Sequence, residues 1–169
     1  MQQKRIHEYG VAVGTLPRGP RNKITDVDGV RVGHCTIDTA ENKTGVTVVV
    51  PGPGNLFDQK LPAAAFVWNG FGKTAGLLQV QELGTLETPI ALTNTLNVGL
   101  VHDALVEYAV EQCQQDGVEM TSLNPVVCEC NDSRINQITR RAVTREHVFE
   151  AFRRADVDFD EGDVGAGKG

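Results

Sequence analysis

The sequence has no run of roughly 20 apolar residues, the length that a membrane-spanning helix needs. Its first residues, Met1 to Glu8, also lack the apolar core of a secretory signal peptide. Basic residues are in the minority, since the formal net charge is -6, whereas a binder of nucleic acid or of anionic membranes needs a basic face. These absences predict a cytoplasmic protein that binds neither nucleic acid nor a membrane.

Cysteine and aromatic residues are also scarce, with four cysteines and 5% aromatics. So few thiols do not build a disulfide framework. Cys128 and Cys130 would share one face of a strand, but the other cysteines and the histidines lack the spacing that a tetrahedral metal site requires. We expect buried free thiols, an aliphatic core and no metal. The length suits a single domain over residues 1–169.

Short aliphatic segments bounded by Gly, Pro, Asn or Asp predict strands. They cover Val30–Ile37, Val46–Val50, Ala63–Trp68, Ile90–Thr93 and Pro125–Cys130. Apolar periodicity predicts helices at about Thr74–Leu83, Asn97–Gln114 and Thr144–Ala155. Their first residues Thr74 and Thr144 are expected N-caps, and Gly84 is an expected C-cap. Because several strands precede the first helix, the order predicts a mixed sheet with helices packed on it, in the α/β (α+β) class.

The end of the chain differs in composition from the rest. An acidic stretch, Asp156 to Asp163, is followed by a nearly all-glycine segment at 164–169. A globular domain rarely finishes on such a run. We therefore expect the chain to stop within a loop, with a C-terminal part of the whole protein missing.

The segment Gly72–Thr74 has the Gly-Lys-Thr ending of a phosphate-binding P-loop. A P-loop also requires a Gly five residues before Gly72, and that position is Val67. A strand-to-helix turn is therefore the favoured interpretation. A nucleotide- or small-molecule-binding module stays open as an alternative.

Polar residues follow two of the predicted strands. Glu129 and Asn131 lie on the same face of their strand, because side chains alternate. A carboxylate and an amide in this place can bind a substrate ammonium and stabilise an oxyanion. Residue types alone favour a simpler turn, capped by Asn131, with Glu129 paired to Arg134. The residues Thr93, Asn94 and Thr95 end the other strand, where capping of the following helix is a sufficient explanation.

The single Trp of the chain, Trp68, and its neighbour Asn69 belong to a glycine-rich segment that is suited to lining a pocket. A Trp that anchors the loop to the core explains the pattern equally well. The sequence shows no Ser in a nucleophile elbow, no convincing pair of carboxylates and no metal cluster. The catalytic set is therefore incomplete. Residue types alone indicate a pocket-forming mixed α/β domain with incomplete chemistry.

Ordered motifs over most of the chain resemble the L-aminopeptidase/D-esterase and β-peptidyl aminopeptidase family. They are Asn22–His34, Thr44–Pro51, Asn69–Gly76, Leu92–Thr95, Asn97–Gly99, Pro125–Asp132 and Glu161–Gly167. Their order and spacing hold from about residue 22 to the C-terminus. Such a series is far more specific than any one of its members.

The resemblance implies a four-layer αββα sandwich, of which this chain is the N-terminal, larger-subunit part. Such proteins cut their own backbone before a Ser or Thr, which becomes the N-terminal nucleophile of a downstream subunit. They release N-terminal residues from small peptides, amides or esters, use no metal or organic cofactor, and are expected to form homo-oligomers. A nylon-oligomer hydrolase is a more distant relative.

The resemblance also implies roles for individual residues. Glu129 matches a Glu near the amino group of the bound substrate, and Asn94, Asn69 and Trp68 are expected to line the substrate pocket. Asn131 stands where several members carry a Tyr that helps to hold the oxyanion, and an Asn amide can donate there with a shorter reach. The nucleophile lies outside this chain, so a truncated and catalytically dead scaffold is a further alternative.

Overall fold

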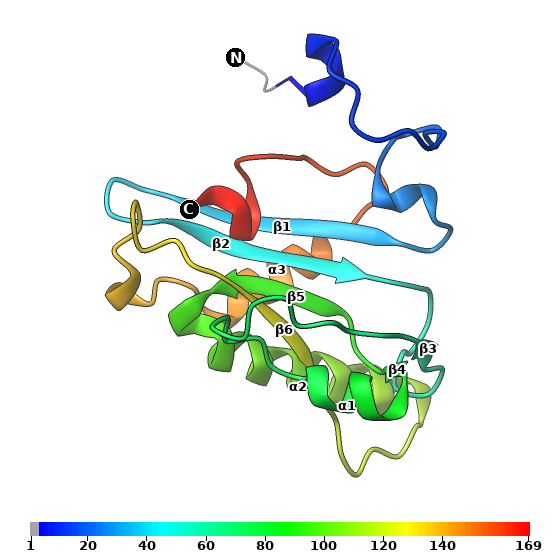
Figure 1. Cartoon of the computed structure of the whole chain (residues 1–169). Coiled ribbons are helices and arrows are strands. Elements are labelled where there is room, and N and C mark those ends of the chain that lie inside the picture. Colours follow the sequence, from blue (N-terminus) through cyan, green and yellow to red (C-terminus); the bar gives the residue numbers. More distant parts are fainter. Residues whose placement is uncertain (1–3) are drawn as a thin grey trace.

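The computed structural model describes residues 4–169, and a four-stranded mixed sheet lies at its centre (Figure 1). The strands, in spatial order, are β1 (Arg31–Asp38), β2 (Lys43–Val50), β5 (Ile90–Asn94) and β6 (Val126–Cys130). Strand β2 is antiparallel to both β1 and β5, whereas β5 and β6 are parallel. The predicted mixed sheet is confirmed, and each of these strands overlaps a predicted one.

Two helices, α2 (Val98–Asp116) and α3 (Arg145–Arg153), cover one face of the sheet. The core between the layers contains Cys35, Val46, Val48, Ala91, Val101, Ala104, Leu105, Val127, Val143, Val148 and Ala151. The predicted apolar stripe of α2 is confirmed, and its Tyr108 stacks on Phe152 of α3 with ring centroids 3.9 Å apart. The core is aliphatic, as the shortage of aromatic residues predicts.

Thr144 is the N-cap of α3, as predicted. The buried face of this helix is formed by Val148 and Ala151. Val148 is fully buried, but Phe149 and Phe152 are only half-buried, and Ala151 is the second fully buried residue. The backbone of α3 approaches β1 closely at Ala151, because Gly33 of β1 has no side chain.

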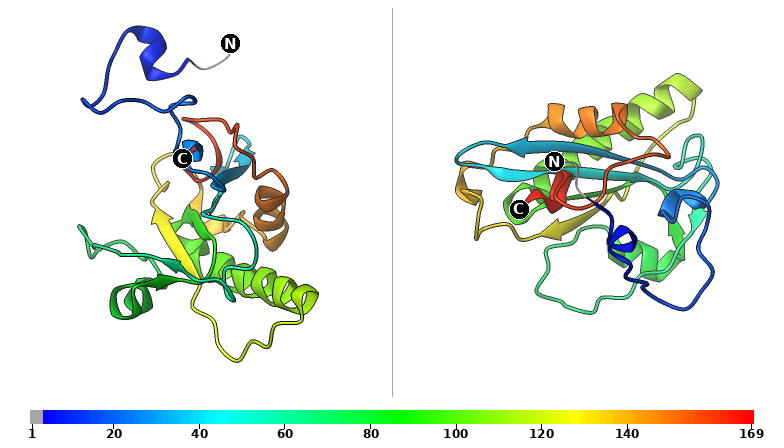
Figure 2. Two further views of the ribbon diagram at one scale, coloured as in Figure 1. Left: turned by 90° about the vertical axis from the view of Figure 1, so that its right-hand side faces the viewer. Right: turned by 90° about the horizontal axis from the view of Figure 1, so that it is seen from above.

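The second face of the sheet is covered only in part. Its cover consists of α1 (Leu77–Leu83), the two-stranded ribbon of β3 (Leu61–Pro62) and β4 (Thr85–Leu86), and the 3-10 helix η5 (Gly165–Lys168). In Figure 2, α1 and η5 lie on the opposite side of the sheet from α3. Val49, Leu92 and Cys128 point to this second face and are only half-buried. Apolar sheet surface therefore remains accessible on this side.

The predicted strand at Ala63–Trp68 is wrong. Strand pairing ends at Pro62, and the segment after it runs as an open loop. Phe66 and Trp68 are 81% and 90% exposed. An apolar run forms a strand only where a sheet edge is free to pair with it, and the rings here face solvent instead.

The first helix begins later than predicted. Ala75 exchanges two backbone hydrogen bonds with Val127 (2.9 and 3.2 Å), so the chain stays extended along the edge of β6 up to this residue. Gly76 then turns the chain with a φ of 88°, which favours glycine. Thr74 is therefore not the N-cap. Gly84, with a φ of 68°, is the C-cap of α1 as predicted.

Short 3-10 helices complete the fold at η1 (Ile6–Tyr9), η2 (Ile24–Asp26), η3 (Thr95–Asn97) and η4 (Ile138–Arg140). Within residues 4–169, no helix is both long and apolar enough to cross a membrane. Over the same residues, no three or more His, Cys, Asp or Glu side chains gather as ligands for a metal ion. All four cysteines are free, although Cys128 and Cys130 are half-buried instead of buried.

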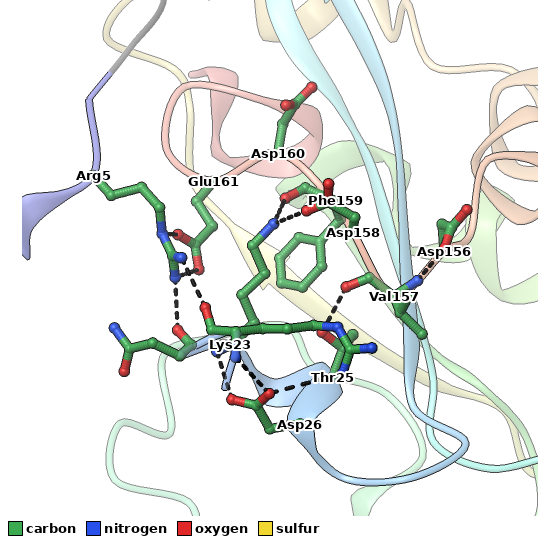
Figure 3. A network of polar contacts seen from close by, with 12 residues as sticks. Arg5, Lys23, Thr25, Asp26, Asp156, Val157, Asp158, Phe159, Asp160 and Glu161 are labelled. Atoms are coloured by element: carbon green, nitrogen blue, oxygen red, sulfur yellow. Dashed lines mark hydrogen bonds and ion pairs between the residues drawn. The ribbon is translucent and has the colours of Figure 1, made fainter. Parts of the chain in front are cut away.

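The N-terminal segment is fastened to the acidic stretch near the C-terminus (Figure 3). Arg5 forms an ion pair with Glu161, and Lys23 donates from its ammonium to Asp158 (2.6 Å). The hydroxyl of Thr25 donates to a backbone carbonyl of the same stretch (2.6 Å). The glycine-rich segment that follows, predicted as a loop, forms η5 instead, and its Gly165 and Ala166 are buried.

Candidate active site

The carboxylate of Glu129 is held at the end of β6 by donors from two other segments. Its Oε2 accepts a hydrogen bond from the backbone N–H of Lys73 (2.8 Å), and its Oε1 accepts one from the hydroxyl of Thr95. The Thr95 bond above all lowers the pKa of Glu129 below its ordinary value, against the opposing effect of burial. Each oxygen keeps a further lone pair. Glu129 is thus an ionised carboxylate with spare acceptor capacity.

Thr95 connects Glu129 to Asn131. Its Oγ1 donates to Glu129 and accepts from Nδ2 of Asn131 (3.2 Å). Oδ1 of Asn131 accepts in turn from the backbone N–H and the hydroxyl of Ser133 (3.1 and 2.8 Å). Glu129 and Asn131 therefore lie on one side of the strand, as alternation predicts. The ion pair between Glu129 and Arg134 is not formed among the described residues.

Sequence reasoning places Asn94 at the pocket and treats Thr95 only as part of a helix cap. In the structure Asn94 is 1% exposed, and its amide donates to the hydroxyl of buried Thr44 (2.9 Å). It is not among the hydrogen-bond partners of Glu129. A substrate contact for Asn94 remains a prediction. The signal for Thr95 is its position directly after a buried strand, a position that helix capping also explains.

Asn69 and Trp68 lie in the loop that precedes α1. The side chain of Asn69 accepts from the backbone N–H of Phe71 (2.9 Å), which stabilises a turn. The turn brings Gly72 against the site, since a Cβ on Gly72 would lie 3.4 Å from Oε2 of Glu129. Trp68 is exposed and so does not anchor the loop to the core. Substrate contacts of Asn69 and Trp68 remain predictions.

The segment Gly72–Thr74 does not form a phosphate cradle. The backbone N–H of Lys73 already donates to the carboxylate of Glu129. The ammonium of Lys73 donates to the carbonyl oxygen of Phe71 and lies over its ring, 3.4 Å from the centroid. A carboxylate in this position repels a phosphate. The nucleotide-binding alternative therefore finds no support in the geometry.

Replacing Thr95 by Val should raise the pKa of Glu129, because it removes the hydrogen bond that lowers this pKa most. The carboxylate becomes protonated as the pH falls through its pKa. In the variant, this protonation should occur at a higher pH, closer to the ordinary value of 4.5. A carboxyl NMR titration of Glu129 measures the shift. An unchanged titration curve would show that Thr95 does not control this group.

Comparison with known proteins relates the chain to a family of peptidases. The model of peptidase family S58 matches residues 22–169. The chain is 37% identical, over 98% of its length, to a β-peptidyl aminopeptidase of Sphingosinicella xenopeptidilytica. Among solved structures it is similar to a Burkholderia sp. β-aminopeptidase (40% identity, TM-score 0.91, 98% of this chain). It is also similar to an L-aminopeptidase D-Ala-esterase/amidase of Ochrobactrum anthropi (30% identity, TM-score 0.87, 99% of this chain), described as a variant of the Ntn hydrolase fold.

The chain thus shares its fold with about half of a structure that is described as a variant of the Ntn hydrolase fold. The chain belongs to peptidase family S58, and the family resemblance is confirmed. It covers 43% of the Sphingosinicella relative, 48% of the Burkholderia structure and 49% of the Ochrobactrum structure. The chain thus spans about half the length of the relatives it matches.

Proposed function

We propose that this chain is the segment that recognises the substrate amine in a cytoplasmic, self-processed aminopeptidase. The whole enzyme releases N-terminal residues from small peptides, amides or esters, and its Ser or Thr nucleophile comes from a downstream subunit of the same precursor. The observation that carries the proposal is the Glu129 carboxylate, ionised and with acceptor capacity left. An aminopeptidase needs such a group, because the free ammonium distinguishes its substrates from internal peptide bonds.

In this function Glu129 binds the substrate ammonium through charge-assisted hydrogen bonds. This contact positions the bond after the N-terminal residue for cleavage. Asn131 lies on the same side of β6. Its Nδ2 carries two hydrogens, of which Thr95 takes one, so one remains to donate to an oxyanion. Thr95 acts as a positioning residue, because it orients both side chains without being required to touch the substrate.

The partly open second face of the sheet is an argument for a further layer that covers it. Val49, Leu92 and Cys128 are only half-buried there. A sheet that is apolar on both faces is normally covered on both. We assign this cover to the downstream subunit, which completes the four-layer sandwich, and we include in the proposal the homo-oligomer expected from the family resemblance.

Residues 1–169 expressed alone should be inactive toward aminoacyl p-nitroanilides, because the nucleophile belongs to the downstream subunit. They should also bind a hydrophobic dye or aggregate, since large exposed apolar patches mark the site of a lost partner. Addition of the downstream subunit should restore turnover and suppress dye binding. A monomeric, dye-silent fragment that melts cooperatively would contradict the two-subunit part of the proposal.

A further inference from the structure

A hollow of about 610 Å³ lies between the loop at residues 66–76, the start of α1 and β6. Its apolar walls come from Phe66, Val67, Trp68, Ala75, Leu77 and Leu78. Sites for small molecules typically measure about 300–1,000 Å³ and combine apolar walls with a few polar groups. The hollow therefore has the size and lining of a binding site for a small apolar group.

The inner wall of the hollow is held by the sheet. Ala75 is paired with Val127 through both of its backbone groups, and the amide of Asn124 donates to the carbonyl oxygen of Gly76 (2.7 Å). These contacts fix the inner end of the loop beside β6. The wall is thus in place before any ligand enters.

The outer wall exposes aromatic rings to solvent. Phe66 and Trp68 are 81% and 90% exposed, and their centroids lie 6.2 Å apart. The chain has only nine aromatic residues, six Phe, two Tyr and one Trp. Two of them lie side by side in solvent instead of in the core. A contiguous exposed apolar patch of this kind marks an interaction site.

Glu129 does not line the hollow itself, but it lies next to a residue that does. Gly72 lines the hollow and also contacts Glu129, whose Oε2 lies 3.4 Å from the position of a Cβ on Gly72. Lys73, the next residue of the same loop, donates its backbone N–H to Oε2 of Glu129 (2.8 Å). The carboxylate proposed to bind the substrate amine is therefore adjacent to the apolar walls.

We propose that this hollow receives the apolar side chain of the substrate's N-terminal residue while Glu129 binds the ammonium of the same residue. The proposal rests on the proposed aminopeptidase function. In an amino acid the ammonium and the side chain leave the same carbon or neighbouring carbons, so the acceptor for one must border the pocket for the other. The enzyme then prefers substrates with large apolar N-terminal residues over glycyl substrates.

The test compares kcat/KM for leucyl and glycyl p-nitroanilide in the complete, two-subunit enzyme. Trp68→Ala and Leu78→Ala remove apolar walls of the hollow and should each lower the leucyl-to-glycyl ratio about tenfold, the size expected for lost contacts in an apolar pocket. Leu83→Ala is the matched control. Leu83 is on the same helix and is 63% exposed, but it does not line the hollow, so the ratio should not change.

Two further outcomes separate this proposal from the function on which it rests. Wild-type enzyme that hydrolyses neither substrate and does not bind leucinamide in calorimetry would overturn both. Turnover with the same leucyl-to-glycyl ratio in Trp68→Ala and Leu78→Ala would overturn the side-chain pocket and leave the aminopeptidase intact. If the ratio is unchanged and light scattering shows a smaller assembly for these variants than for the wild type, the aromatic loop belongs to an interface between copies of the protein instead.

Discussion

Replacing Glu129 by Gln in the complete enzyme should lower kcat/KM for substrates with a free N-terminal amine by about 10- to 100-fold. A hydrogen bond to a charged group contributes about 1.5–3 kcal/mol, and each 1.4 kcal/mol corresponds to a factor of ten. Gln also places an N–H group against one of the donors that Glu129 now satisfies, Thr95 or the Lys73 backbone. Steady-state kinetics with aminoacyl p-nitroanilides measure the effect.

Two controls accompany this substitution, one with a changed substrate and one with a changed residue elsewhere in the protein. N-acetylated analogues lack the ammonium and should be poor ligands for both enzymes. Glu111→Gln removes the same charge from an exposed position on α2 and should leave kcat/KM unchanged. If Glu129→Gln handles free-amine substrates normally, Glu129 is only a turn residue.

The sequence predicted those helices and strands whose pattern of apolar residues is contained within the element itself. The apolar stripe of α2 and the β-branched runs of the four sheet strands are of this kind. The segment Ala63–Trp68 has an equally apolar run, but strand formation also needs a free edge. The edge of β6 beside Val127 is taken by Ala75, a pairing between residues 52 positions apart that no local pattern shows.

The same limit explains why Thr95 and not Asn94 meets Glu129. Alternation correctly set Glu129 and Asn131 on one side of their strand. Which residue of β5 faces them depends on register, and the parallel pairing sets Thr93 beside Glu129. Thr95, the first residue after β5, donates its hydroxyl to Glu129, whereas the amide of Asn94 donates to Thr44. A shift of one residue in this register would have exchanged the two roles.

The strongest effect on stability is expected at Gly33 in β1. A Cβ at this position would lie 1.9 Å from the carbonyl oxygen of Ala151 and 2.8 Å from the backbone nitrogen of Ala155. Both obstacles are backbone, so they cannot move aside as a flexible side chain could. Gly33→Ala must therefore push the end of α3 away from the sheet.

We expect Gly33→Ala to destabilise the complete protein by about 3 kcal/mol, the upper end of the usual cost of overpacking, because α3 contributes Val148 and Ala151 to the core. Urea denaturation of wild type and variant measures the difference. Gly99→Ala is the matched control, since Gly99 lies in α2 and a Cβ there meets nothing within 4 Å. Alanine is also the better helix former, so this variant should be as stable as the wild type or slightly more stable. Equal stability of Gly33→Ala and wild type would show that α3 can shift along β1 at no cost, and the close approach at Gly33 would then not hold the helix layer in place.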